Sequence, residues 1–124
     1  MKSNEFKTTE SEEQIALFEW SAMMEYKYPE LKLMFHVPNG GKRNITTAAR
    51  LKKEGVRAGV PDVVLPVARS GFHGLYIEMK AKGGKLSDNQ LWWIAATRKQ
   101  GYLSVVCYSW EQAKDVIETY LKVI

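Results

Sequence analysis

The sequence predicts a single α/β domain in which helices flank a mixed β-sheet, with the element order α-β-α-β-β-α-β-α. Three observations lead to this fold class. The 124 residues match the ~100–150 residues of one common domain. Segments whose apolar residues recur at helical spacing alternate with short runs rich in Val, Leu and Ile. Gly, Pro and capping motifs separate these segments without forming a linker, so residues 1–124 should make one domain, with residues 1–10 flexible.

Three elements are predicted in the first half of the chain. Ser11-Glu-Glu-Gln14 has the form of a capping box and predicts a helix that continues to about residue 28, where Pro29 ends it. Residues 33–37 are apolar apart from one histidine and predict a short strand, which stops at a Pro-Asn-Gly-Gly turn. Residues 46–54 predict a short basic helix that a glycine closes.

The second half of the chain predicts three strands and two helices. Residues 60–67 are rich in Val and Leu and predict a buried strand, and residues 75–80 alternate between apolar and polar side chains. The short turn between these strands makes the pair antiparallel. A second capping box at Ser87 begins a helix that runs to about residue 100, and a right-handed crossover leads to a strand at residues 102–108. Ser109 caps a last helix that ends near residue 122.

The composition excludes several classes of protein. Hydrophobic residues make up 45% and charged residues 26%, which is typical of globular proteins and too apolar for a disordered chain. No segment reaches the ~18 consecutive apolar residues of a membrane span, and the polar N-terminus does not resemble a signal peptide. Cys107, the single cysteine, excludes a disulfide framework and a multi-cysteine zinc site. We therefore expect a cytoplasmic protein without a membrane partner.

The net charge of +4 is unevenly distributed. Residues 1–31 carry three Lys and seven Glu, whereas residues 32–58 carry seven basic residues and one acidic residue. A basic central segment indicates an anionic partner, of which nucleic acid is the commonest large one, although a solvated helix face gives the same pattern. The loop Gly40-Gly-Lys-Arg43 is either a phosphate-binding loop, because glycine lets phosphates approach, or an ordinary turn. The predicted DNA contacts are Gly40, Gly41, Lys42, Arg43, Arg50, Lys52, Lys53 and Arg57.

Three charged residues interrupt the apolar strands of the predicted hairpin. Asp62 stands near the start of the first strand, and Glu78 and Lys80 share one face of the second, because residues two apart point the same way. Two carboxylates at the end of a sheet are ligands for Mg²⁺, and the carbonyl of Met79 offers a further oxygen. A neighbouring lysine holds or deprotonates water and offsets charge on a phosphate. A solvated ion pair on a polar strand face is the alternative interpretation.

Further motifs complete an ordered pattern around these three residues. In chain order they are Glu12-Glu13-Gln14, Phe35-His-Val-Pro-Asn-Gly-Gly41, Gly55-Val-Arg-Ala-Gly-Val-Pro-Asp62, Tyr76-Ile-Glu-Met-Lys80 and Leu86-Ser-Asp-Asn-Gln90. In Pro-Asp and Glu-Met-Lys the chain resembles the PD-(D/E)xK nuclease superfamily. In the fuller set it resembles the stand-alone VRR-NUC domains of phages and bacteria, over about residues 11–120. The resemblance implies a restriction-endonuclease-like fold.

The resemblance also implies a metal-dependent deoxyribonuclease that uses Mg²⁺, with Mn²⁺ as a substitute. The catalytic residues that it implies are Asp62, Glu78, Lys80, Glu12 and Gln90. Asp62, Glu78, Glu12 and the carbonyl of Met79 would bind the metal, and Lys80 would position or activate the water. Glu13 is the alternative to Glu12 as the carboxylate on the first helix.

Branched DNA is the substrate that the resemblance implies. Stand-alone members resemble Holliday-junction resolvases, and two symmetric cuts need two sites, so a homodimer is expected. The settings implied are DNA repair or phage genome processing in a bacterial or phage-infected cell. Two alternatives stay open: a non-catalytic DNA-binding module, and a nuclease that cuts linear duplex or simple DNA ends.

Two further features allow more than one interpretation. His36 is either a structural residue of its strand or a group that faces the metal site. Trp92 and Trp93 are candidates for stacking on unpaired bases. Because adjacent helical residues diverge by ~100°, we expect one Trp in the core and the other partly exposed or at a dimer contact.

Overall fold

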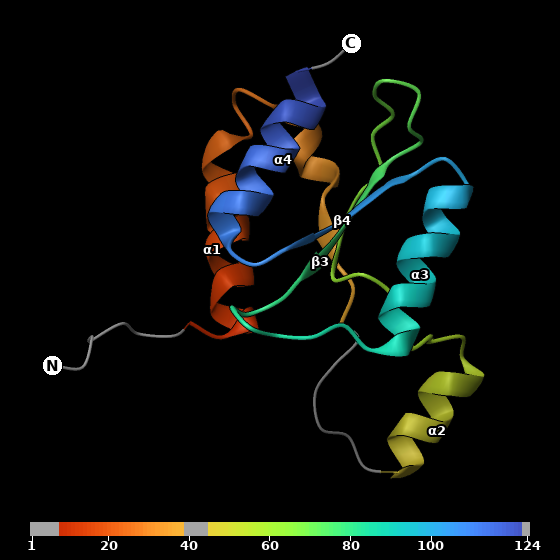
Figure 1. Ribbon diagram of the computed structural model, residues 1–124. Helices are drawn as coiled ribbons and strands as arrows, with labels where there is room; N and C mark the ends of the chain where they lie inside the picture. The colour runs from red at the N-terminus through yellow and green to blue at the C-terminus, as the bar shows by residue number, and fades with distance from the viewer. Residues whose placement is uncertain (1–7, 39–44, 123–124) are drawn as a thin grey trace, which may run out of the picture.

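The structure is a computed structural model that describes residues 8–38 and 45–122. Within these residues four strands form one mixed sheet with helices on both faces (Figure 1). The elements are α1 (Glu10–Met24), the 3₁₀ helix η1 (Pro29–Leu33), β1 (Phe35–His36), α2 (Ile45–Lys53), β2 (Val63–Leu65), β3 (Leu75–Met79), α3 (Asp88–Lys99), β4 (Leu103–Cys107) and α4 (Trp110–Lys122). Of the segment expected to be flexible, Thr9 caps α1 and Glu10 begins it, and residues 1–7 lie outside the described residues. No helix in the described ranges is long and apolar enough to cross a bilayer.

The strands are ordered β1-β2-β3-β4 across the sheet, which confirms the predicted mixed α/β fold. β2 pairs antiparallel with both β1 and β3, whereas β4 pairs parallel with β3 after the crossover through α3. α1 and α4 contact each other on one side of the sheet, and α3 packs against β4 on the other (Figure 1). The register sets Val63 opposite Ile77, so the residue before β2 lies beside the end of β3.

The first helix begins and ends earlier than the sequence predicted. Its N-cap is Thr9 rather than Ser11, because the Thr9 hydroxyl accepts from the N–H of Glu12 while the Glu12 carboxylate accepts from the N–H of Thr9. The competing box at Ser11 ends in a neutral glutamine, whereas the box at Thr9 places a carboxylate in the positive first turn of the helix. The helix ends at Met24, and Pro29 begins η1 instead of closing α1.

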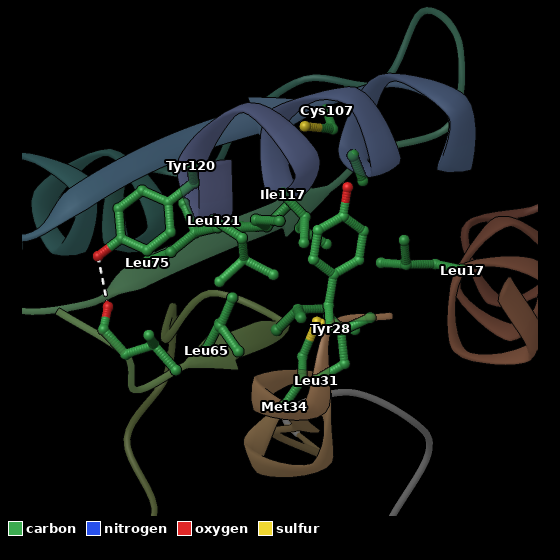
Figure 2. Close-up of a cluster of buried hydrophobic side chains, with 14 of the residues drawn as sticks. Leu17, Tyr28, Leu31, Met34, Leu65, Leu75, Cys107, Ile117, Tyr120 and Leu121 are labelled. Carbon is green, nitrogen blue, oxygen red and sulfur yellow. Dashed lines mark hydrogen bonds between the residues drawn. The ribbon is translucent and has the colours of Figure 1, made fainter. Parts of the chain in front are cut away.

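The hydrophobic core lies between the sheet and the layer formed by α1 and α4 (Figure 2). Leu17 of α1, Leu75 and Ile77 of β3, and Ile117 of α4 are fully buried there. Burial of each such side chain contributes ~1.5–3 kcal/mol. Tyr120 adds a polar contact, since its hydroxyl donates to a main-chain carbonyl after β2. Because Leu75 and Ile77 face this core, the alternate side chains of β3 point to the α3 side of the sheet.

α2 differs from the other helices because none of its residues is buried. It spans Ile45–Lys53, one residue before the predicted 46–54. Figure 1 shows α2 below α3, away from α1 and α4. Its contribution to the core is therefore small, and its position beside α3 leaves a groove between the two helices.

Candidate active site

Glu78 projects from β3 to the side opposite the hydrophobic core, yet it is only 1% exposed. Its Oε2 accepts a hydrogen bond from the side-chain amide of Gln90 at 3.1 Å. Its Oε1 is buried and has no hydrogen-bond partner within the described residues. An unsatisfied buried polar atom costs about 1–3 kcal/mol, and more when the group is charged. The pair on β3 is therefore not a solvated one, and Glu78 is placed where a bound cation or a proton would satisfy it.

Asp62 lies directly before β2 and next to Glu78, as the hairpin predicts. Its main-chain carbonyl accepts from the N–H of Val37 at 2.8 Å and lies 2.9 Å from Nδ1 of His36. Its carboxylate Oδ2 accepts from the N–H of Met79 at 2.8 Å. Asp62 is thus fixed by β1 through its main chain and by β3 through its side chain. His36 supports the main chain of Asp62, in line with the structural interpretation of this histidine.

The two carboxyl groups perturb each other strongly. The pKa of Glu78 is raised from 4.5 to about 8, chiefly by burial and also by the charge and hydrogen bonding of Asp62. The charge of Glu10 acts in the same direction, whereas the Lys80 ammonium opposes the rise in pKa by favouring the ionised form. At neutral pH without a cation, Glu78 therefore carries a proton most of the time. A divalent cation at this point would replace that proton and remove the repulsion.

Lys80 follows β3 on the same side as Glu78 and is 8% exposed. Its N–H donates to the carbonyl of Cys107 at 2.9 Å, so the pairing with β4 continues one residue beyond β3. Gly84 lies against its aliphatic chain, because a Cβ on Gly84 would come 3.5 Å from Cδ of Lys80. The fold therefore brings the predicted Asp62, Glu78 and Lys80 into one charged cluster at the end of β3.

The first helix directs Glu10, rather than Glu12 or Glu13, to this cluster. Glu12 is engaged in the capping box of α1. Glu13 is buried and accepts from a main-chain N–H at the start of α4 at 2.8 Å, which ties the two helices together. Glu10 lines the same cavity as Glu78 and raises the pKa of that residue. Glu12 is therefore not brought to the site, and Glu10 occupies the place expected for it. In the sequence, the pattern Thr9-x-x-Glu12 is the signal that Glu12 caps the helix and is not free to reach the site.

The side-chain amide of Gln90 makes two hydrogen bonds, one within the cap of α3 and one to the site. Its Oε1 accepts from the N–H of Ser87 at 2.8 Å, and the Ser87 hydroxyl accepts from the N–H of Gln90 at 3.2 Å, which confirms the predicted capping box. Its Nε2 donates to Oε2 of Glu78. This hydrogen bond ties the start of α3 to β3, so Gln90 lies beside the strand that carries Glu78.

A cavity of about 210 Å³ lies in front of the two carboxyl groups. Its walls come from the start of α1, the segment 58–60, the ends of β2 and β3 nearest the site, and the start of α3. Gly59 has a φ of +89° and touches α3 so closely that a Cβ would lie 2.6 Å from main-chain carbon of Asn89. Only glycine allows this approach, so the sequence Ala-Gly-Val before Pro61 shapes one wall of the cavity.

The described part of the predicted DNA-binding set lies on and just after α2. Arg50, Lys52 and Lys53 are exposed on the helix, and Arg57 is exposed in the segment that follows. Within residues 8–38 and 45–122 none of these four forms an ion pair. Their charges are therefore available to an anionic partner. The other predicted contacts, Gly40, Gly41, Lys42 and Arg43, lie outside the described residues.

The donor atoms of the cluster suit a hard divalent cation. No three His, Cys, Asp or Glu side chains in the described segments are close enough to form a metal site by themselves. Mg²⁺ commonly takes only one or two protein carboxylates and completes its coordination with water and substrate oxygens. Asp62 and the unsatisfied Oε1 of Glu78 provide such a pair, and the main chain of Met79 lies against Asp62. Oxygen donors of this kind favour Mg²⁺ or Mn²⁺ over zinc.

Both the sequence and the fold match one family of domains. The model of the VRR-NUC domain family matches residues 8–111, which include the cluster and the start of α3. A solved structure of a VRR_NUC domain protein has a TM-score of 0.81 and 33% sequence identity, and the match covers 94% of this chain and 91% of that chain. The comparison with curated proteins gave no match. The chain therefore belongs to the VRR-NUC family and carries its nuclease-type domain.

Proposed function

We propose that the chain is a Mg²⁺-dependent DNA endonuclease that hydrolyses phosphodiester bonds in branched DNA, and that Mn²⁺ can replace Mg²⁺. The observation that supports this most is the buried Glu78, which lies beside Asp62 with one oxygen unsatisfied within the described residues and with Lys80 next to it. The arrangement destabilises the protein without a cation, so packing alone does not account for it. Membership of a family with a nuclease-type domain supports the same activity.

The chemistry would be divided among the residues of the cluster. Asp62 and Glu78 would hold the cation, with the carbonyl of Met79 as a further oxygen donor, and the charge of Glu10 in the cavity wall would favour cation binding. When bound, the cation polarises the scissile phosphate and lowers the pKa of a coordinated water. The Lys80 ammonium would orient the attacking water by hydrogen bonding and offset the negative charge that develops on the phosphate. Its burial excludes competing bulk water and strengthens that interaction.

The substrate we propose is branched DNA, the Holliday junction in particular, cut by a homodimer. Two symmetric cuts in a four-way junction need two active sites, and one chain supplies one. The exposed Arg50, Lys52, Lys53 and Arg57 would bind the phosphate backbone next to the cavity. Such an enzyme would act on DNA in the cytoplasm of a bacterial or phage-infected cell, in repair or in phage genome processing.

Cleavage of a labelled four-way junction, compared with a linear duplex of the same arm sequence, tests the proposal. We expect symmetric cuts in the junction with Mg²⁺ and none with EDTA. Asp62→Ala and Lys80→Ala should abolish cleavage while circular dichroism and junction binding stay unchanged. Glu111→Gln is the matched control, because it removes an exposed carboxylate of α4 that does not line the cavity, and it should cut like the wild type. Wild-type rates in Asp62→Ala would exclude the assigned site.

Two other outcomes would identify the alternative functions. Junction binding without cleavage in either Mg²⁺ or Mn²⁺ would indicate a non-catalytic DNA-binding module. Metal-dependent cutting of linear duplex or simple ends alone would keep the nuclease and exclude the junction as its substrate. The buried carboxyl of Glu78 weighs against the non-catalytic module, since a protein that binds no cation gains stability from an uncharged residue there.

A further inference from the structure

The groove between α2 and α3 has the chemistry of a binding site for single-stranded DNA. We infer that it holds bases that are unpaired at the branch point of the substrate, as in a four-way junction whose central pairs have opened, an inference that rests on the proposed nuclease function and narrows its substrate. The groove has a volume of about 1120 Å³. This exceeds the ~300–1,000 Å³ of sites that enclose a small molecule, so the groove suits a segment of a polymer.

The groove adjoins the catalytic cavity directly. Ala58 and Asn89 line both spaces. Between them Gly59 approaches Asn89 so closely that a Cβ would lie 2.6 Å from it. Because the two spaces share these wall residues, a strand that lies in the groove leads towards Glu78 and Asp62.

One wall of the groove is basic and the other is aromatic. Lys52, Lys53 and Arg57 supply the positive charge from α2 and the segment after it, and no acidic residue is among the described residues that line the groove. Trp92 and Trp93 face them from α3. Trp92 is 64% exposed, and its ring meets that of Trp93 edge to face at 5.9 Å. Neither Trp belongs to the hydrophobic core, which corrects the expectation that one of them would.

The far end of the groove is held in place by an aromatic cluster. Tyr102 lines the groove and meets Tyr76 edge to face at 5.2 Å, and it meets His73 in the same way at 5.8 Å. Tyr76 belongs to β3, so the groove is attached to the strand that carries Glu78. A wall fixed in this manner loses little freedom on binding, which favours affinity.

A nucleic-acid strand satisfies both walls at once. Phosphates neutralise the three cations, and a base covers an exposed indole ring. The bases of an intact duplex are stacked on each other, so Trp92 can stack only on an unpaired base. A two-fold contact between copies would use this same patch on both chains, and it would bring two sets of these three cations together with no acidic residue on the described walls of the groove to offset them. Charge and exposure therefore favour unpaired DNA over a duplex or a dimer contact in this groove.

Binding in EDTA, where no cleavage occurs, tests the inference. The probes are a labelled oligothymidylate of ~12 nucleotides, within the ~4–16 nucleotides of known single-strand sites, and a blunt duplex of equal length. By fluorescence anisotropy, Trp92→Ala should weaken binding of the single strand about tenfold or more and change duplex binding less than about twofold. Trp92→Phe should retain most of the affinity. Leu91→Ala is the matched control, because Leu91 is 50% exposed on the same helix and does not line the groove.

Three results would overturn the inference. The first is that Trp92→Ala and Leu91→Ala bind the single strand with equal affinity. The second is that Trp92→Ala loses as much affinity for the duplex as for the single strand. The third is that the protein sediments as a dimer and Trp92→Ala converts it to a monomer. The last would assign the groove to a contact between copies. Because the binding assay needs no metal, single-strand binding that depends on Trp92 in a protein that cuts nothing would support the groove and refute the nuclease. Metal-dependent cleavage by a protein whose single-strand binding does not depend on Trp92 would support the nuclease and refute the role of the groove.

Discussion

Replacing Glu78 with glutamine should stabilise the protein in the absence of metal, and the gain should depend on pH. Burial beside Asp62 raises the pKa of Glu78 from 4.5 to about 8 in the folded state. In the unfolded chain the pKa returns to its ordinary value. Between pH 4.5 and about 8 the folded protein keeps the proton on Glu78, whereas the unfolded chain loses it. The free energy of unfolding therefore falls as the pH rises through this range, and the stability present below pH 4.5 is lost. Glu78→Gln carries no charge at any pH and escapes that loss.

The size of the effect follows from the shift in pKa. The rise from 4.5 to about 8 corresponds to at most ~5 kcal/mol, at ~1.4 kcal/mol per pH unit. Relaxation of the site and entry of water lower such values in real proteins, so we expect about 2–3 kcal/mol at pH 8. That difference raises the Tm by about 6–12 °C for a domain of this length. Near pH 5 the folded wild type carries a neutral carboxyl, and the two proteins should unfold at almost the same temperature.

Thermal unfolding followed by circular dichroism between pH 5 and pH 9, in EDTA, measures both the gain and its pH dependence. Glu111→Gln serves as the control, because Glu111 is exposed on α4 and its loss should change the Tm little at any pH. A Glu78→Gln variant that unfolds below the wild type at every pH would refute the reasoning. So would a gain of equal size at pH 5 and at pH 9, since packing rather than charge would then be its cause.

Three further comparisons test other parts of the structure. Glu10→Ala should slow cleavage at limiting Mg²⁺. Glu12→Ala should cut normally, but its free energy of unfolding in urea should fall by about 1 kcal/mol because the helix cap is lost. Slow cleavage in Glu12→Ala alone would reverse the assignment of the two glutamates. Gly59→Ala should cost about 1–3 kcal/mol in urea, because its φ of +89° and the contact with α3 exclude a Cβ; an unchanged midpoint would contradict that contact. Tyr120→Phe should lower the free energy of unfolding by about 1 kcal/mol, because it removes the hydrogen bond of the Tyr120 hydroxyl. Tyr28→Phe should leave it unchanged, because the buried Tyr28 hydroxyl has no partner within the described residues. Equal midpoints for the two variants would count against this difference.

The positions of the site residues on β3 could be predicted because a strand has a period of two. Leu75 and Ile77 are apolar and enter the core, so Glu78 must point away from it whatever lies elsewhere in the fold. Gln90 was placed in the same way by the capping box that it shares with Ser87. Local patterns such as these do not depend on distant contacts, and for this reason they predicted the strand, the helix start and the side of the sheet.

The carboxylate from α1 could not be placed in this way, because two capping boxes overlap there. Both Thr9 and Ser11 satisfy the local pattern, and the choice between them decides which glutamate is left free. Part of the answer lies in Glu13, whose hydrogen bond reaches a main-chain N–H of α4 that is 97 residues away in the sequence. The sequence does not show that contact. Once Glu12 caps the helix and Glu13 binds α4, Glu10 is the glutamate that remains for the cavity.

β3 combines two energetic roles, and their balance explains why the site should couple metal binding to stability. Leu75 and Ile77 contribute ~1.5–3 kcal/mol each on the core side, which is enough to offset most of the cost of ionising Glu78 on the other side. A cation that binds only the folded protein stabilises it by RT ln(1 + [Mg²⁺]/Kd), where the Kd at a given pH already includes the cost of ionising Glu78. Mg²⁺ at pH 8 should therefore raise the Tm of the wild type and leave that of Glu78→Gln almost unchanged, by calorimetry with and without EDTA. An equal rise in both proteins would mean that the cation stabilises the fold from a site that does not include Glu78.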